Sequence, residues 1–415
     1  MPVIFVILKI LVVNCMLNKI ESHPKKVLML VDGLDITNGV SVTCKEIAKN
    51  WHKVSNKWEL LIYGTSVRSL DDEKYDGACI RVDRSLIQIP VLGYKRMWLS
   101  IPLVELFKLF SSSDYCIVHS ATPGPIGVLG SIAACILHKP LVMTHHTRMV
   151  DYMKYYAPRG LRTIITLVAK FLFRKFYSLG TRTVAHSPAT IDELKDLGAK
   201  VIDYLPMGVP IPYNDIDKLI GDRKRARERI CRTFDIPENK KIIMYIGRIA
   251  KEKNLNYFAD VSDRMDHKFI IVGDGPVKKS LEKYPNLILP GFRYGNELAE
   301  MYLGSDLFLC TSVSETLGKT LLEALSYGTP ILVPDKGYHN SIIKEEGPAV
   351  HKYRWGIQQR AVNNIVDSIN TIIEEVSDNP EVTKTALEYA MQFSWENLIV
   401  EYADPYEKIF PDSNS

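Results

Sequence analysis

Short apolar runs alternate with stretches of helical periodicity along most of the chain. Helical periodicity marks residues 41–51 and 216–234 and the polar stretch after Gln358. A continuous apolar run suits a strand that helices cover on both faces of a parallel sheet. The runs that we predict to be strands are 26–31, 58–64, 79–82, 114–120, 140–146, 242–246, 268–272, 286–290, 307–310 and 331–333. The alternation of strands with helices predicts open α/β sheets.

The pattern is interrupted once and then begins again. Residues 204–214, YLPMGVPIPYN, contain three prolines and a glycine and are typical of a linker between domains. A chain of 415 residues also exceeds what a single core usually supports. We predict two α/β domains, 25–205 and 206–390, followed by a C-terminal segment, 391–415. Ligands of such sheets bind at the carboxyl ends of the strands.

The first 24 residues are predicted to form an apolar N-terminal extension. Residues 1–17, MPVIFVILKILVVNCML, have the length of the apolar region of a signal peptide, but Lys9 interrupts them and no clear small-residue cleavage site follows. They are also shorter than the roughly 20 residues that a membrane-spanning helix needs. Two interpretations stay open: a weak membrane anchor, or an upstream extension with translation starting at Met16.

The composition is that of a soluble globular protein, with 46% hydrophobic and 24% charged residues. The seven cysteines are scattered and form no CxxC pair, which disfavours zinc and disulfides and favours a reducing compartment. We therefore expect a cytoplasmic location. Residues 25–205 hold 24 Lys and Arg against 16 Asp and Glu, whereas residues 206–415 hold 26 against 31. The basic first half predicts an anionic partner.

The basic charge is concentrated between residues 154 and 182. No acidic residue occurs from Tyr152 to Ile191, and aromatic and aliphatic residues are interleaved with the cations. A basic, aromatic-rich helix can lie on anionic lipid headgroups, so peripheral membrane association is one hypothesis. An ordinary helix whose apolar face lies in the core is the other. We expect no nucleic-acid partner, because no binding motif accompanies the charge. The cations are Lys154, Arg159, Arg162, Lys170, Arg174, Lys175 and Arg182.

Residues 306–334 contain the strongest candidate site. They predict a buried strand, a polar loop, a helix that begins near Gly318, and a second strand. A helix N-terminus attracts phosphate through its free backbone N–H groups and its dipole. Glu315 before the helix and Glu323 inside it can accept hydrogen bonds from hydroxyls on either side of a diphosphate. A P-loop is excluded, because Val313 stands where that motif needs glycine.

A second candidate site follows the predicted strand 242–246. The loop GRIAKEKN, 247–254, contains Arg248 and Lys253 at the carboxyl end of that strand. Arg as a planar fork and Lys as a point charge can both neutralise a diphosphate. Together with the helix that begins near Gly318, this loop predicts a site for a nucleotide-sugar.

With these motifs in order, the chain resembles the retaining GT-B glycosyltransferases of family 4 from about residue 25 to residue 410. The spacing from Glu315 to Glu323 is that family's E-x7-E motif. The resemblance implies two Rossmann-like α/β domains that face a central cleft, with a C-terminal helix that crosses back to the first domain. The motifs that carry it are NGVS (38–41), TPGPIG (122–127), HHTRMVDYMKYY (145–156), LPMGVP (205–210), GRIAKEKN (247–254), VGDGP (272–276) and SETLGKTLLEALSYGTPIL (314–332).

The resemblance also implies roles for residues of the second domain. Arg248 and Lys253 would hold the donor diphosphate, and Glu323 would accept hydrogen bonds from the ribose hydroxyls. Glu315 would contact hydroxyls of the transferred sugar. The backbone N–H groups of Gly318, Lys319 and Thr320 would lie nearby.

Two residues of the first domain receive roles in the same way. Gly39 would let its loop approach the phosphates, because a side chain there would block the approach. His146 would lie beside the sugar and assist the transfer, although His145 stays open as the functional histidine.

The implied activity is the transfer of a hexose from a nucleotide-diphosphate sugar to a lipid or glycan acceptor. The resemblance implies retention of the anomeric configuration, with neither a metal nor a cofactor. Two alternatives stay open: a GT-B nucleotide-sugar epimerase, and a non-catalytic module that binds nucleotide-sugars. The base of the donor, uracil, guanine or adenine, is also open.

Overall fold

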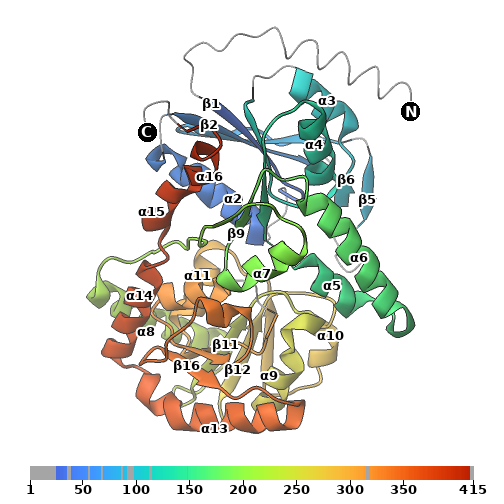
Figure 1. Ribbon diagram of the computed structural model, residues 1–415. Coiled ribbons are helices and arrows are strands. Elements are labelled where there is room, and N and C mark those ends of the chain that lie inside the picture. Colours follow the sequence, from blue (N-terminus) through green and yellow to red (C-terminus); the bar gives the residue numbers. More distant parts are fainter. Residues whose placement is uncertain are drawn as a thin grey trace. The chain divides into compact units, whose positions relative to one another are not determined.

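The computed structural model describes residues 25–34, 39–54, 57–66, 69–85, 87–90, 98–111, 115–146, 148–314 and 318–411 (Figure 1). These residues form two compact units. The first unit contains the described residues up to Pro206 together with those from Glu396 onward, and the second is Met207–Trp395. Each unit is built around its own parallel sheet. The predicted α/β class with two parallel-sheet units is confirmed.

The first unit contains an eight-stranded sheet in the order β10-β9-β8-β7-β1-β2-β4-β3. Only β3 runs antiparallel to its neighbour. The central strands are buried because their side chains are apolar on both faces of the sheet. The strands are β1 (Lys25–Leu30), β2 (Trp58–Ser66), β3 (Glu73–Tyr75), β4 (Ala78–Arg84), β7 (Ile117–Ser120), β8 (Leu141–His145), β9 (Arg182–Ala185) and β10 (Ile202–Tyr204).

Helices follow most of these strands, and a separate antiparallel hairpin joins β5 (Gln88–Pro90) to β6 (Trp98–Ser100). Helix α4 begins at Pro125, where the missing N–H of proline costs no helical hydrogen bond. The helices of the first unit are α2 (Gly39–Asn50), α3 (Leu103–Ser111), α4 (Pro125–Ile136), α5 (Met149–Tyr156), α6 (Arg162–Tyr177) and α7 (Pro188–Asp196).

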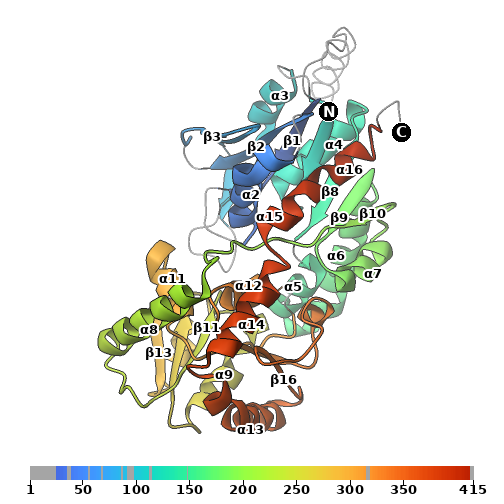
Figure 2. The same ribbon diagram turned by 90° about the vertical axis from the view of Figure 1, so that its left-hand side faces the viewer.

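The end of the chain returns to the first unit (Figure 2). It consists of three short segments, α15 (Trp395–Leu398), η5 (Ile399–Ala403) and α16 (Asp404–Glu407), where the family resemblance implied one crossover helix. The ring of Tyr406 is buried against Trp51 and Trp58. Lys408 pairs with Asp203 at 3.2 Å. These contacts attach the C-terminal segment to a sheet that begins almost 400 residues earlier.

The second unit contains a six-stranded parallel sheet in the order β13-β12-β11-β14-β15-β16. This is the doubly wound order in which the direction of progression reverses between the first and fourth strands, here β11 and β14. The carboxyl ends of these two strands are therefore the expected ligand site. The strands are β11 (Ile242–Ile246), β12 (Lys268–Val272), β13 (Leu287–Gly291), β14 (Leu307–Leu309), β15 (Ile331–Pro334) and β16 (Val350–Tyr353).

Seven α-helices are described in the second unit. Asp215 caps the first of them by accepting hydrogen bonds from the N–H groups of Asp217 and Lys218. Helices α8, α11, α12 and α14 pack against one another, and α9 packs against α13 (Figure 1). The bounds are α8 (Ile216–Thr233), α9 (Leu255–Ser262), α10 (Lys278–Leu281), α11 (Gly295–Leu303), α12 (Lys319–Ser326), α13 (Gln358–Val376) and α14 (Pro380–Met391).

All ten strands predicted from apolar runs occur, with bounds shifted by at most a few residues. The sequence pattern missed β3, β5, β6, β9, β10 and β16, each of only three or four residues. Among the described residues, no helix combines the length and the apolar character needed to cross a membrane. The predicted N-terminal extension lies outside the described residues.

Candidate functional site

The loop after β11 is joined to the loop after β14. The Thr311 hydroxyl donates to the carbonyl of Lys253 at 2.9 Å, and the Asn254 side chain donates to the carbonyl of Thr311 at 3.3 Å. The hydroxyls of Ser312 and Ser314 donate to the carbonyl of Glu252 at 3.1 and 3.0 Å. These bonds fix the cationic loop at the point where the strand order reverses.

Two glycines of the VGDGP motif let a third loop pack on this one. A Cβ atom on Gly273 would lie 2.0 Å from the carbonyl oxygen of Gly247, and one on Gly275 would lie 2.2 Å from that of Ile249. Gly273 also has a φ of +138°, which disfavours any other residue. Backbone packing therefore requires these two glycines.

Arg248 and Lys253 both lie in this loop. The guanidinium of Arg248 pairs with the carboxylate of Glu252, which is buried. Lys253 ends a short 3₁₀ turn, and Asn254 after it adopts the left-handed conformation with a φ of +51°. Glu252 was not singled out in the sequence because it looks like one charge of a solvated KEK run. Its burial beside Arg248 indicates that it orients the guanidinium.

The N-terminus of α12 follows the loop after β14. Gly318 precedes the helix in the left-handed conformation with a φ of +73°, and Lys319 and Thr320 form its first turn. One turn later, the Glu323 carboxylate accepts a hydrogen bond from the Tyr302 hydroxyl at 2.8 Å. Burial raises the pKa of Glu323, and the ammonium of Lys319 at 3.9 Å and the hydrogen bond oppose that rise. Glu315 lies outside the described residues.

In the first unit, a pair of histidines lies at the carboxyl ends of β8 and β9. The register pairs His145 with Ala185, so the next residues, His146 and His186, come side by side. Their ring centroids are 4.7 Å apart, with the planes tilted by 33°. His186 is buried, and its Nδ1 lies 2.8 Å from the carbonyl oxygen of Leu205. Burial lowers the pKa of His186 to about 4.

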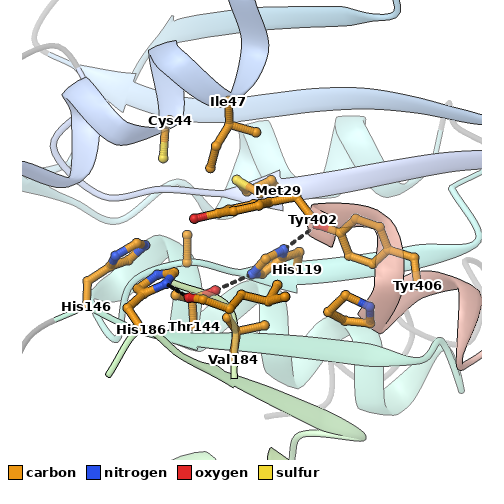
Figure 3. Close-up of a pocket in the computed structure, with 13 residues that line it drawn as sticks. Met29, Cys44, Ile47, His119, Thr144, His146, Val184, His186, Tyr402 and Tyr406 are labelled. Carbon is orange, nitrogen blue, oxygen red and sulfur yellow. Dashed lines mark hydrogen bonds between the residues drawn. The ribbon is translucent and has the colours of Figure 1, made fainter. Parts of the chain in front are cut away.

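His146 and His186 line a small cavity of about 20 Å³ between the sheet, α2 and the C-terminal segment (Figure 3). His119 lies in the same wall. Its ring nitrogens are hydrogen-bonded to the hydroxyls of Tyr406 and Thr144, each at 2.6 Å. Burial lowers the pKa of His119 to about 3, so the ring is neutral near pH 7. The C-terminal segment is thus connected through His119 to the strand that precedes His146.

His145 has a different environment from His146. Its Nδ1 lies 2.8 Å from the Tyr177 hydroxyl, and its Nε2 lies 3.7 Å from the Glu193 carboxylate. Glu193 also accepts a hydrogen bond from Arg148 at 2.5 Å. His145 therefore belongs to a buried polar network that fixes the loop after β8, whereas His146 lines the cavity. This arrangement favours His146 over His145 as the functional histidine.

The carboxyl end of β1 is organised by a buried carboxylate that the sequence did not single out. Asp32 accepts hydrogen bonds from the Thr122 hydroxyl at 2.7 Å and from the N–H of Ile126 at 3.0 Å. It thereby fixes the TPGPIG segment at the start of α4. Gly39 begins α2, and a Cβ atom there would meet nothing within 4 Å. The role of Gly39 beside a phosphate therefore stays a prediction.

The described geometry brings the candidate residues together in two sets, one in each unit. Arg248 and Lys253 share the loop after β11, which is hydrogen-bonded to the loop after β14. His146 lies with His186 in the first unit. Among the described residues, no three His, Cys, Asp or Glu side chains gather as a metal site would require. Independence from metal ions stays a prediction.

Comparison with known families covers both units. Residues 37–211 match the family model Glycosyltransferase Family 4, and residues 226–388 match Glycosyl transferases group 1. The chain belongs to the family 4 type of GT-B glycosyltransferases. The first match extends to residue 211, past the predicted boundary at 205, and the second lies within 206–390.

Several curated relatives are glycosyltransferases. The chain is 28% identical over 332 residues to a sulfoquinovosyl transferase of Arabidopsis thaliana, covering 78% of this chain and 62% of the relative. It is 30% identical over 247 residues to a GDP-mannose-dependent alpha-mannosyltransferase of Mycobacterium tuberculosis, covering 59% and 62%. It is also 30% identical over 244 residues to an alpha-monoglucosyldiacylglycerol synthase of Streptococcus pneumoniae, covering 55% and 54%. The chain thus spans little more than half to three fifths of the length of these relatives.

Solved structures share the fold. Sucrose-phosphate synthase from Thermosynechococcus elongatus matches with a TM-score of 0.71 at 14% identity, over 94% of this chain and 100% of that one. The Anabaena HepE protein in complex with UDP-glucose matches with a TM-score of 0.64 at 17% identity, over 92% and 99%. At these identities the likeness establishes the fold alone.

Proposed function

We propose that the protein is a retaining glycosyltransferase that transfers a hexose from a nucleotide-diphosphate sugar to a lipid or glycan acceptor. The observation that carries the proposal is the arrangement at the carboxyl ends of β11 and β14. Two cations and a helix N-terminus lie on adjacent loops at the carboxyl ends of two neighbouring parallel strands. Ligands bind at this position in sheets of this type. This combination suits a diphosphate better than any neutral ligand.

The donor is held by the second unit in this proposal. Arg248, oriented by Glu252, and Lys253 bind the diphosphate and stabilise the charge that develops on the departing nucleotide. Glu323 accepts hydrogen bonds from the ribose hydroxyls. The Tyr302 hydroxyl bonds its Oε2, and its Oε1 lies 3.9 Å from the Lys319 ammonium, beyond hydrogen-bond distance. Glu315 and the N–H groups of Gly318, Lys319 and Thr320 bind the sugar and its phosphate.

The transfer step itself uses few protein groups. The acceptor hydroxyl attacks the anomeric carbon on the face that the leaving diphosphate occupies, and a diphosphate oxygen takes the hydroxyl proton. The carbon–oxygen bond to the diphosphate breaks, so the configuration is retained without a covalent enzyme intermediate. His146 lies beside the sugar and assists the transfer, and Gly39 leaves room for the phosphates. No metal takes part in this scheme.

A lipid acceptor is supported by the surface of α6. The buried face of this helix is formed by Ala169, Phe176 and Tyr177, yet its outward face is apolar too. Isolated exposed apolar residues are ordinary, but a continuous stripe beside cations is typical of a helix that lies on a membrane surface. The stripe consists of Leu161, Ile164, Leu167, Val168, Phe171 and Leu172, each at least 51% exposed.

Cations accompany this stripe. Lys170, Arg174 and Lys175 are exposed on α6, and the ammonium of Lys175 lies 5.7 Å from the centroid of the Phe171 ring. The name of the Streptococcus pneumoniae relative also includes a diacylglycerol product. We propose that α6 docks on an anionic membrane, with the apolar stripe among the lipid chains and the cations at the headgroups.

The donor proposal is tested by thermal unfolding with UDP, GDP and ADP. A nucleotide at about 100 times its dissociation constant adds roughly 2.7 kcal/mol of stability, which gives a visible shift in the unfolding temperature. We expect one nucleotide to stabilise the wild type and to lose most of its effect in Arg248→Ala and Glu323→Ala. If no nucleotide stabilises the wild type, the donor site is wrong.

Turnover distinguishes the alternatives. The matching nucleotide-sugar is incubated with liposomes that contain diacylglycerol, and the sugar product is identified. His146→Ala is expected to abolish transfer while leaving nucleotide binding intact. An epimerase would instead release a rearranged sugar without an acceptor, and a binding module would leave the donor unchanged.

A further inference from the structure

We propose that His186 is a positioning residue for His146: it supports one face of the His146 ring and holds that ring in its place for the transfer step. The inference deepens the proposed function and rests on the role given there to His146. His186 carries no role in the motifs that identified the site.

The backbone register makes the contact specific. Strands β8 and β9 are parallel neighbours, and the pair His145–Ala185 is the last one of the ladder. His146 and His186 continue these strands at the same edge, where their rings meet at 4.7 Å between centroids with a 33° tilt. The contact is therefore one of faces, and Figure 3 shows both rings on the same side of the cavity.

His186 is itself held from behind. A carbonyl oxygen can only accept a hydrogen bond, so the Nδ1 of His186 must carry the proton that it donates to Leu205 at 2.8 Å. The ring is only 5% exposed. A side chain fixed in this way makes a rigid support for the ring of His146 that packs against it.

The surroundings also keep the support neutral. The described side chains that line the cavity include no carboxylate, lysine or arginine; the titratable ones are Cys44, His119, His146, Tyr402 and Tyr406. His145 is close enough to oppose a charge on His186. A neutral His186 ring can contact His146 whether His146 is neutral or protonated, because an aromatic face attracts a cation. A protonated His186 would instead repel a protonated His146.

The test compares His186→Ala with His186→Phe in the full-length protein. Phenylalanine keeps a flat ring against His146, whereas alanine removes it. We expect His186→Ala to lower kcat by about 10- to 100-fold, the range in which a small displacement of a reacting group operates. The donor KM should change less than twofold, because the second unit binds the donor. His186→Phe should retain most of the wild-type kcat.

Rescue provides a readout that general destabilisation would not produce. Imidazole added to His186→Ala should restore part of kcat by filling the space left by the side chain, and it should have no effect on the wild type. His351→Phe, on β16 of the second unit, is the matched control and should leave kcat unchanged.

Three outcomes would overturn the inference. His186→Ala with wild-type kcat would show that the ring is dispensable. His186→Phe that is folded by circular dichroism and as slow as His186→Ala would show that a ring face is not enough. Equal losses in kcat and in nucleotide stabilisation would indicate a purely structural role. If His146→Ala is fully active, the role that the proposed function gives to His146 fails; if the wild type transfers no sugar, the proposed function itself fails, and both results are distinct from the three above.

Discussion

At the scale of single residues, two buried histidines make the stability of the fold depend on pH. The pKa of His119 is lowered to about 3 and that of His186 to about 4, in both cases chiefly because burial disfavours the charged ring. In the unfolded chain both rings titrate near 6.5. The unfolded state therefore binds more protons below that value, and stability must fall as the pH falls.

We expect the free energy of unfolding to fall by about 2 kcal/mol for each of these histidines when the pH is lowered from 8 to 5. The measurement is urea unfolding of the wild type and of His186→Phe at several pH values in that range. Phenylalanine cannot titrate, so the variant should lose about half of the contribution of the pair. An identical pH dependence in the two proteins would mean that His186 does not change its protonation on unfolding.

The residues of the candidate site differ in how well the sequence predicts them. Arg248 and Lys253 were found because they follow an apolar run, so their place at a sheet edge could be predicted, whereas His146 was singled out by the family resemblance. His186 follows β9, four residues whose only apolar members are Val184 and Ala185, and no strand was predicted there. Glu252 was missed because its burial depends on the loop that covers it. The local sequence pattern does not predict which loop that is.

At the scale of elements, α6 shows a limit of a different kind. The sequence identified its cations and left two interpretations open, a core helix or a membrane helix. The structure has apolar residues on both the buried face and the outward face of this helix, each set at the spacing of a helix face. Which apolar residues face the core depends on the neighbouring elements, so composition alone could not separate the two.

The outward stripe of α6 can be tested by sedimentation with liposomes. We expect the wild type to bind vesicles that contain anionic lipid more tightly than neutral vesicles. Ile164→Ser combined with Phe171→Ser should weaken binding to both kinds, because about 25 cal/mol per Å² of apolar burial is lost. Lys170→Gln, Arg174→Gln and Lys175→Gln together should remove only the preference for anionic lipid, by about 1 kcal/mol per charge.

The matched control for charge is a triple variant of exposed cations in the second unit, Lys224→Gln, Arg232→Gln and Lys279→Gln. It changes the net charge equally and should leave binding unchanged. If the control weakens binding as much as the α6 variants, the attraction is a property of net charge. If neither set has an effect, α6 is not a membrane surface.

At the scale of the whole molecule, the repeated alternation of strands and helices predicted two α/β domains, and the structure has two parallel sheets. The order of strands within each sheet was not predictable, since periodicity carries no information on which strands are neighbours. The return of the C-terminal segment to the first unit came from family resemblance. Its physical cause, the burial of Tyr406 against Trp51 and Trp58, is a contact between residues about 350 positions apart.

That contact predicts that the C-terminal segment stabilises one unit and not the other. A protein that ends at Trp395 loses the buried side chains of Ile399, Tyr402 and Tyr406 from the first unit. Truncation of one large buried side chain costs about 2–5 kcal/mol, and a whole domain has about 5–15 kcal/mol of stability. We therefore expect the first unit to unfold at a much lower temperature, while the second unit still binds nucleotide.

Differential scanning calorimetry with and without nucleotide can assign the transitions, because only the unit that binds nucleotide shifts with it. Tyr406→Phe serves as the mild comparison. It keeps the ring contacts and removes only the hydrogen bond to His119, so it should cost the first unit about 1 kcal/mol. If the truncated protein instead lost the nucleotide-dependent transition, residues 396–411 would be needed by the second unit, and the division between the units at Trp395 would be wrong.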